Sequence, residues 1–147
     1  MTVQRIDTRY GEIKVSSPGP KIEYDNLQIY HQTQDRVVRL QGPALRAFKA
    51  AEAALSKNHQ RIIKITGIGY RDWYTQYALW RSDDQRYANP DSSMHVEGLA
   101  VDVDTGQRFK GKTVAQTQHL IREALEDKGF HFGVGGEPWH CSFHVVG

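Results

Sequence analysis

The stretch SSMHVEGLAVDVD, residues 92–104, constrains the fold more than any other segment of the chain. Its second half predicts a strand at residues 99–104, because Leu99, Val101 and Val103 alternate with polar positions and face a core. The same stretch carries ionisable residues, namely His95, Glu97, Asp102 and Asp104. Unpaired polar atoms beside a core cost about 2–7 kcal/mol each. These groups therefore need partners, which are other side chains, water or a metal ion.

A chain of 147 residues is long enough for a buried core, and we expect one domain over residues 1–147. Charged residues make up 24% and hydrophobic residues 39% of the chain, which argues against wholesale disorder. The net charge of +2 is too small to predict nucleic-acid binding, and it weakly favours an anionic polymer such as a cell wall. Cys141 is the single cysteine, so an internal disulfide and a four-cysteine zinc site are excluded.

The N-terminal sequence MTVQRIDTRYGEIKV has no apolar signal-peptide core, and no apolar run approaches the length of a membrane span. We therefore expect synthesis in the cytoplasm without a signal peptide and without membrane insertion. Work outside the cell would need another route, such as release by lysis. We also expect a monomer.

Residues 42–57 and 113–127 have the apolar periodicity of helices. Pro43 suits the first turn of the earlier helix, and its apolar face is formed by Leu45, Phe48 and Leu55. In the later helix the residues expected to point inward are Val114, Ile121 and Leu125.

Residues 71–84 predict another helix, whose aromatic stripe consists of Trp73, Tyr77 and Trp80. We expect this stripe to pack in the core, and a surface that stacks on sugars is the alternative.

Further strands are predicted at residues 61–67, 130–134 and 140–146. In the last of these, alternation places His140, Ser142 and His144 on the face opposite Cys141, Phe143 and Val145. The segments EIKV and NLQIY predict short strands joined by a turn at SSPGP, and residues 1–40 are expected to form an N-terminal extension or cap. The fold class is therefore α+β, with a small, mostly antiparallel sheet flanked by about three helices.

Residues 106–113, GQRFKGKT, match the phosphate-loop pattern G-x-x-x-x-G-K-[ST] and follow a predicted strand. A nucleotide-binding core needs further strands, one of them with a magnesium-binding Asp, and the rest of the chain is too short to supply them. Thr113 and Gln116 instead form the capping box T-x-x-Q, which satisfies backbone donors at a helix start. Capping is the preferred interpretation, and ATP binding is the alternative.

A metal site is predicted from His95 and Asp102 together with the later segment EPWH, which supplies Glu137 and His140. His95 and Asp102 would face opposite sides of one uninterrupted strand, but Gly98 between them allows a bend that brings both to one site. Two imidazoles and a carboxylate form a familiar catalytic zinc set with a fourth position open to water.

A carboxylate just outside the ligand set could take the proton of that water and pass it to a leaving amine. Glu137 suits this role, and Glu97 is the alternative base. The other histidines are not expected to bind the metal ion directly. Surface or packed positions are expected for His31, His59 and His119, whereas His131 or His144 is a candidate to orient a ligand or substrate.

These residues carry a resemblance to a known family. The run from Ser93 to Asp102 matches S-x-H-x-x-G-x-A-x-D, a signature of the zinc D-alanyl-D-alanine carboxypeptidases of the VanY type, and residues 137–140 match that family's E-P-W-H. Upstream, TGIGYRDWYTQ is similar to the family's strand followed by GYR. The resemblance spans residues 60–147, and residues 1–40 lie outside it.

The resemblance implies a fold like that of hedgehog and D,D-peptidase domains, and Zn²⁺ as cofactor. It implies His95, Asp102 and His140 as zinc ligands, Glu137 as catalytic base and Arg71 as a group that polarises the scissile carbonyl or holds an anionic group. Substrate contacts are assigned by the same resemblance to Ser93, Gln76, Trp139 and Tyr70. The implied substrate is the peptidoglycan stem peptide.

The activity expected first is D-Ala-D-Ala carboxypeptidase, because related sequences with EPWH cut that bond. Related phage lysins cut the L-Ala-D-Glu bond instead, and a short chain without a signal peptide also suits an endolysin. A non-catalytic zinc-containing binding or virion protein is a further alternative, because hedgehog-like relatives keep zinc without established peptidase activity. A zinc deaminase is disfavoured because the two cysteines that it requires are missing.

Overall fold

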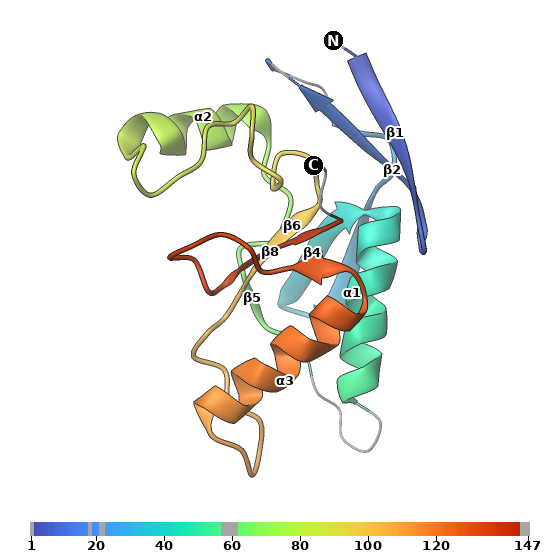
Figure 1. The fold of residues 1–147 in the computed structure, drawn as a ribbon, viewed down its shortest axis with the longest axis vertical. Helices are drawn as coiled ribbons and strands as arrows, with labels where there is room; N and C mark the ends of the chain where they lie inside the picture. The colour runs from blue at the N-terminus through green and yellow to red at the C-terminus, as the bar shows by residue number, and fades with distance from the viewer. Residues whose placement is uncertain (1, 18, 21–22, 57–61, 145–147) are drawn as a thin grey trace.

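The computed structural model describes residues 2–17, 19–20, 23–56 and 62–144. These residues form an α+β fold with helices packed on small antiparallel sheets, which confirms the predicted fold class (Figure 1). In chain order the elements are β1 (Thr2–Thr8), β2 (Gly11–Ser17), β3 (Leu27–Thr33), β4 (Arg36–Gln41), α1 (Gly42–Leu55), β5 (Ile65–Thr66), α2 (Trp73–Ser82), β6 (Ala100–Val103), α3 (Val114–Asp127), β7 (Phe130–His131) and β8 (His140–Phe143).

The central sheet has the strand order β5-β6-β8-β7, and each neighbouring pair is antiparallel. In β6, Val101 and Val103 are buried, whereas Asp102 is half-buried on the other face. The alternation predicted for this strand is confirmed. It keeps the apolar side chains in the core and leaves the carboxylate at the edge of the protein interior.

Helices α1 and α3 lie side by side and cover the central sheet (Figure 1). Pro43 stands in the first turn of α1, where its missing N–H costs no helical hydrogen bond. Leu45 and Phe48 are buried, and the Phe48 ring meets Phe130 of β7 edge-on at 6.4 Å between centroids. Leu55, at the helix end, is partly buried against the same core.

The capping box predicted at the start of α3 is present. The Thr113 hydroxyl accepts a hydrogen bond from the Gln116 N–H at 3.0 Å, and the Gln116 side chain accepts one from the Thr113 N–H at 2.9 Å. Ile121 and Leu125 are buried as predicted, but Val114 is 42% exposed. The inward position in the first turn belongs to Thr117, whose hydroxyl is bonded to the backbone.

The prediction that the aromatic stripe of α2 packs in the core is wrong. Within α2, all of whose residues the structure describes, Gln76 alone is buried. Trp73 and Tyr77 stack on each other with centroids 5.3 Å apart, and Tyr77 is 38% exposed. The helix projects away from α1 and α3 (Figure 1). Its rings contact one another, and the centroids of Tyr77 and Trp80 are 6.0 Å apart.

Three predicted strands are shorter than expected, and of residues 130–134 only Phe130–His131 form strand. Of residues 61–67, the described part forms strand only at Ile65–Thr66. The Gln107 side chain instead bonds the backbone here, accepting from the Lys64 N–H at 3.0 Å and donating to the Ile62 carbonyl at 2.7 Å. The last strand ends at Phe143, because His144 adopts a positive φ of 63°. Val145 and Val146 lie outside the described residues.

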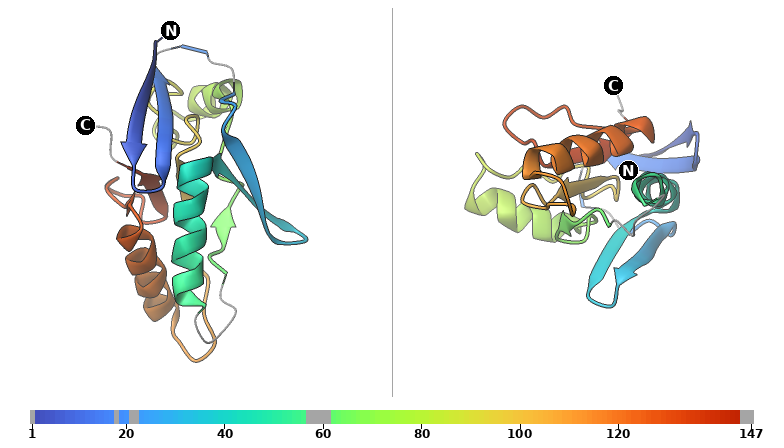
Figure 2. Two further views of the ribbon diagram at one scale, coloured as in Figure 1. Left: turned by 90° about the vertical axis from the view of Figure 1, so that its right-hand side faces the viewer. Right: turned by 90° about the horizontal axis from the view of Figure 1, so that it is seen from below.

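The described part of residues 2–41 contains two antiparallel hairpins, β1–β2 and β3–β4, where the sequence predicted short strands and a cap of uncertain structure. EIKV falls in β2 and most of NLQIY in β3, and Pro18 of the predicted turn lies outside the described residues. The two hairpins lie on opposite sides of α1 (Figure 2). None of the helices in the described part of the chain has the length and apolar character needed to cross a membrane.

Candidate metal centre

Three ionisable side chains meet at one face of the central sheet. Asp102 in β6 lies directly opposite His140 in β8, and His95 comes from the turn before β6. Ligand atoms from the three side chains all lie within 4.8 Å of one another. Asp102 Oδ1 is 3.2 Å from His95 Nε2 and 3.1 Å from His140 Nδ1. The structure therefore brings together the three residues that the spacing suggested.

A tight turn explains how His95 reaches a residue seven positions further along. We call residues 94–98 the histidine loop. Gly98 has a φ of 72°, which a residue with a side chain rarely adopts. The loop closes through a hydrogen bond from the Gly98 N–H to the His95 carbonyl at 3.1 Å and another from the Leu99 N–H to the Met94 carbonyl at 3.0 Å. The bend predicted at Gly98 is therefore present.

The surroundings of His95 determine which ring nitrogen faces the site. Its Nδ1 is 2.8 Å from the Gly69 carbonyl oxygen, which can only accept, so Nδ1 carries the proton. The lone pair of Nε2 then faces Asp102, as in metal sites where an outer carbonyl orients the imidazole. A lone pair and a carboxylate at 3.2 Å need a cation between them, either a proton or a metal ion.

Asp102 is held in its charged form. Burial alone raises the pKa of its carboxyl, but the adjacent His140 and His95 side chains outweigh burial and keep the pKa well below its usual range. The carboxylate is therefore ionised at neutral pH, which a metal ligand must be.

The three groups fit a zinc ion. Zinc in a tetrahedral site with bonds of about 2.0 Å has ligand atoms about 3.3 Å apart. The distances of 3.1 Å and 3.2 Å from Asp102 Oδ1 to the imidazole nitrogens agree with this spacing. Two imidazoles and one carboxylate also leave the fourth position for water or substrate.

Gly69 is confined by backbone atoms on both sides, and its replacement gives a test of the scaffold. Its φ is 95°, and an added Cβ would meet the Arg39 carbonyl oxygen at 3.0 Å and the Ala100 carbonyl oxygen at 3.3 Å. We expect Gly69→Ala to lower the free energy of unfolding by about 2–5 kcal/mol, from left-handed strain plus overpacking. Urea unfolding measures this loss.

Gly67→Ala is the matched control for that substitution. Gly67 also has a positive φ, 68°, but open space surrounds the added Cβ. We expect a loss of about 1–2 kcal/mol, from backbone strain alone. Equal losses in the two variants would show that Gly69 is not sterically confined.

A cleft of 620 Å³ opens over the three ligand atoms. Most of the residues that the sequence analysis assigned to catalysis or substrate binding line it. These are Arg71, Gln76, Ser93, Glu137 and Trp139. Tyr70 is not among the described residues of the cleft wall, because its ring packs beneath the Arg39 guanidinium at 5.0 Å.

Gln76 orients Arg71. Its side-chain oxygen accepts a hydrogen bond from Arg71 Nη1 at 2.6 Å, and its Nε2 donates to the Ala88 carbonyl at 2.8 Å. Gln76 is only 2% exposed, so its amide is committed to these bonds and Arg71 presents the charge to the cleft. Gln76 was predicted to contact the substrate, but its buried amide instead bonds and orients Arg71.

The two candidate bases lie in different places. Glu137 lines the cleft, in the loop that leads into β8. Glu97 is buried outside the cleft wall and accepts hydrogen bonds from the Ser16 N–H at 3.2 Å and from the Tyr24 hydroxyl. Burial and then the hydrogen bond to Glu97 raise the pKa of Tyr24. The geometry thus leaves Glu137 as the base candidate and gives Glu97 a place in the scaffold.

The remaining histidines stand apart from the ligand group. His31 and His131 are exposed, and His119 is exposed beside Glu123 at 3.2 Å. His144 donates its N–H to the Gly129 carbonyl at 3.0 Å, and neither it nor His131 lines the described cleft wall. His59 lies outside the described residues.

Some cleft residues were missed by the sequence analysis. Arg86 and Tyr87 come from the loop after α2, which carries no motif. Ser142 also lines the cleft, and its signal was present, because strand alternation places it on the same face as His140.

Comparison with solved structures gives the chain the fold of the VanY-type D,D-peptidases. VanYB in complex with D-alanine-D-alanine matches with a TM-score of 0.59 and 17% identity, over 86% of this chain and 82% of that chain. A variant of the vancomycin-resistance D,D-pentapeptidase VanY in complex with Zn(II) matches with a TM-score of 0.52 and 19% identity, over 86% and 84%. The LD-carboxypeptidase LdcB matches with a TM-score of 0.50 and 21% identity, over 97% and 84%. No protein-family model and no curated protein matches the chain.

Proposed function

We propose that this chain is a zinc-dependent peptidase that hydrolyses the terminal D-alanyl-D-alanine bond of the peptidoglycan stem peptide. The observation that carries the proposal is the convergence of His95, Asp102 and His140 within one cleft that also contains Glu137 and Arg71. The fold supports it, because neighbours with this fold include a D,D-pentapeptidase in complex with zinc and a protein bound to D-alanine-D-alanine.

His95 Nε2, Asp102 Oδ1 and His140 Nδ1 would hold the zinc ion. When bound, zinc supplies a Lewis acid that polarises a carbonyl and lowers the pKa of water to about 7. The Gly69 carbonyl fixes the tautomer of His95, and the ionised Asp102 offsets part of the metal charge.

Glu137 performs the proton transfers in this proposal. Its carboxylate takes one proton from the attacking water, so that the water oxygen forms a bond to the scissile carbonyl carbon. The same carboxyl then gives the proton to the departing amine as the C–N bond breaks. Glu137 lines the cleft, which gives its carboxylate access to water there.

Arg71 supplies a fixed positive charge. Held by Gln76, its guanidinium faces the cleft and suits the terminal carboxylate of a stem peptide or the oxyanion that forms during attack. Ser93 and Trp139 line the same wall and are the proposed contacts to the rest of the peptide.

Product mapping tests the proposal. We expect the zinc-loaded protein to remove one terminal alanine from a soluble stem pentapeptide and from purified peptidoglycan, detected by mass spectrometry. Release of whole stem peptides would instead indicate cleavage of the L-Ala-D-Glu bond. Unchanged substrates in the presence of bound zinc would contradict the peptidase proposal and favour a binding or virion role.

A further inference from the structure

We propose that Gln41 is a positioning residue for the metal centre, because its side chain ties strand β2 to the histidine loop that carries His95. The inference rests on the proposed function in that it takes the centre to bind zinc. It also gives the N-terminal hairpin, which the sequence treated as a cap, a direct connection to the site.

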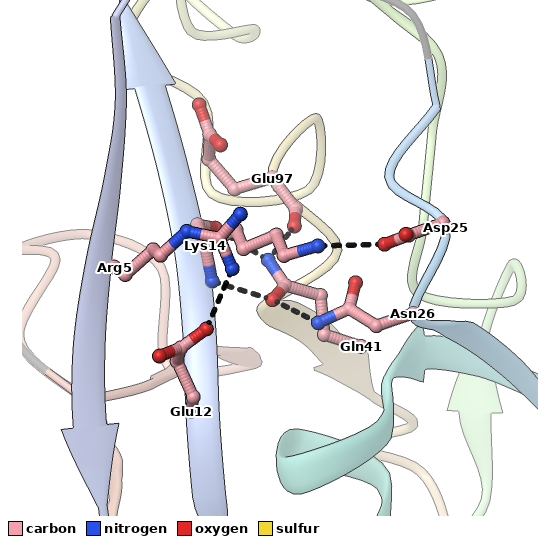
Figure 3. A network of polar contacts seen from close by, with 7 residues as sticks. All are labelled: Arg5, Glu12, Lys14, Asp25, Asn26, Gln41 and Glu97. Atoms are coloured by element: carbon pink, nitrogen blue, oxygen red, sulfur yellow. Dashed lines mark hydrogen bonds and ion pairs between the residues drawn. The ribbon is translucent and has the colours of Figure 1, made fainter.

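The Gln41 amide is fully buried and fully bonded (Figure 3). Its Nε2 donates to the Lys14 carbonyl at 2.6 Å and to the Glu97 carbonyl at 2.7 Å. Its Oε1 accepts from the Lys14 N–H at 2.7 Å and from Asn26 Nδ2 at 2.9 Å. These four bonds use both hydrogens and both lone pairs of the amide. The side chain therefore has one defined orientation.

The backbone of Gln41 also forms a hydrogen bond to the histidine loop. Its N–H donates to the Gly98 carbonyl at 2.9 Å, so one residue bonds two consecutive carbonyls of the histidine loop. The Gly98 N–H in turn donates to the His95 carbonyl at 3.1 Å. Two hydrogen bonds thus separate Gln41 from the backbone of a proposed zinc ligand.

Strand β4, which ends at Gln41, also fixes the carbonyl that orients the His95 ring. The Arg39 N–H donates to the Ile68 carbonyl at 2.7 Å, and the Tyr70 N–H donates to the Arg39 carbonyl at 2.9 Å. These bonds bracket Gly69, whose carbonyl oxygen lies 2.8 Å from His95 Nδ1. Hydrogen bonds from β4 therefore help to fix both the backbone and the ring of His95.

The position of Gln41 at the start of α1 supports this role. It is the N-cap residue of the helix, where Ser, Thr, Asp or Asn would normally bond a helical N–H. Gln41 makes no such side-chain cap bond. Its amide is committed to β2 and the histidine loop instead, at the expense of helix capping.

Gln107 provides a matched control for a purely structural role. It is also a buried glutamine, and its amide bonds the Lys64 N–H and the Ile62 carbonyl at 3.0 Å and 2.7 Å. In the described part of the chain these bonds hold backbone ahead of β5 and do not involve the histidine loop. Methionine at either position keeps the side-chain length but removes the amide.

The experiment compares Gln41→Met and Gln107→Met with the wild-type chain. Zinc affinity is measured by competition with a chelator, and the Co(II)-substituted proteins are compared by their visible absorption spectra. We expect both variants to lose thermal stability, Gln41→Met more than Gln107→Met, because four amide hydrogen bonds are removed instead of two. Only Gln41→Met is expected to weaken zinc binding, by about 10-fold to 100-fold, as substitutions that support metal ligands do, and to change the Co(II) spectrum.

The outcomes separate the two proposals. If the wild-type chain binds no zinc, the proposed function fails. If it binds zinc and Gln41→Met matches it in affinity and spectrum, the positioning role is overturned; equal weakening in Gln107→Met overturns it too. Should Gln41→Met not fold, Gln41→Glu replaces it, because this variant keeps the acceptor for the Lys14 N–H and loses the donors to the Lys14 and Glu97 carbonyls.

Discussion

We expect Glu137→Gln to lower kcat on a stem pentapeptide by about 100-fold to 10,000-fold while the protein keeps its zinc. Glutamine preserves the size of the side chain but cannot accept a proton from water. Glu137 lies in the cleft wall and is not one of the three residues whose ligand atoms converge. Steady-state kinetics measure the loss of turnover, and metal analysis of the same preparation measures the zinc content.

Glu123→Gln is the control for this prediction. Glu123 is exposed on α3, where it pairs with His119 at 3.2 Å, and its replacement should change neither kcat nor zinc content. Full turnover by Glu137→Gln would remove Glu137 as the base. Loss of zinc from Glu137→Gln would instead make it a ligand.

Local periodicity accounts for the parts of this fold that the sequence predicted. The alternation in residues 99–104 placed Asp102 on the polar face of β6, and the T-x-x-Q pattern placed the start of α3 at Thr113. Both signals concern neighbours within a few residues. The meeting of Asp102 with His140 needed one further step, the antiparallel pairing of β6 with β8. The family resemblance implied that the two residues share a metal ion, but it did not give this pairing.

Contacts between segments far apart in the chain produce no local pattern in the sequence, so they were not predicted. Glu97 looked like a second candidate base because it stands near the ligands in sequence, yet its carboxylate bonds Ser16, 81 residues away. Gln41 bonds Lys14 and Glu97 across 27 and 56 residues. No spacing rule marks these residues, since their partners are set by tertiary packing.

The aromatic stripe of α2 shows where periodicity misleads. A row of Trp73, Tyr77 and Trp80 has the spacing of a buried helix face, and burial would be its ordinary outcome. The structure places α2 beside the cleft, with Gln76 as its buried contact. Periodicity identified the helix correctly but not what the helix packs against.

We expect His140→Ala to weaken zinc binding by at least about 100-fold. Changes in residues that merely support a metal ligand cost about 10-fold to 100-fold in affinity, so loss of a ligand should cost at least about 100-fold. With zinc at about 100 times the wild-type Kd, the metal should stabilise the wild-type chain by about 2.7 kcal/mol but the variant by about 0.4 kcal/mol or less. Thermal unfolding with and without zinc measures this difference.

The wild-type stabilisation corresponds to a rise in Tm of about 5–11 °C, whereas the variant should shift by about 2 °C or less. Each protein is compared with its own zinc-free form, because removal of the imidazole also takes a hydrogen-bond partner from Asp102. His119→Ala, an exposed histidine on α3, should keep the full zinc-dependent shift. An undiminished shift in His140→Ala would mean that the chain binds zinc elsewhere, and the three converging side chains would then lose their assignment as the metal centre.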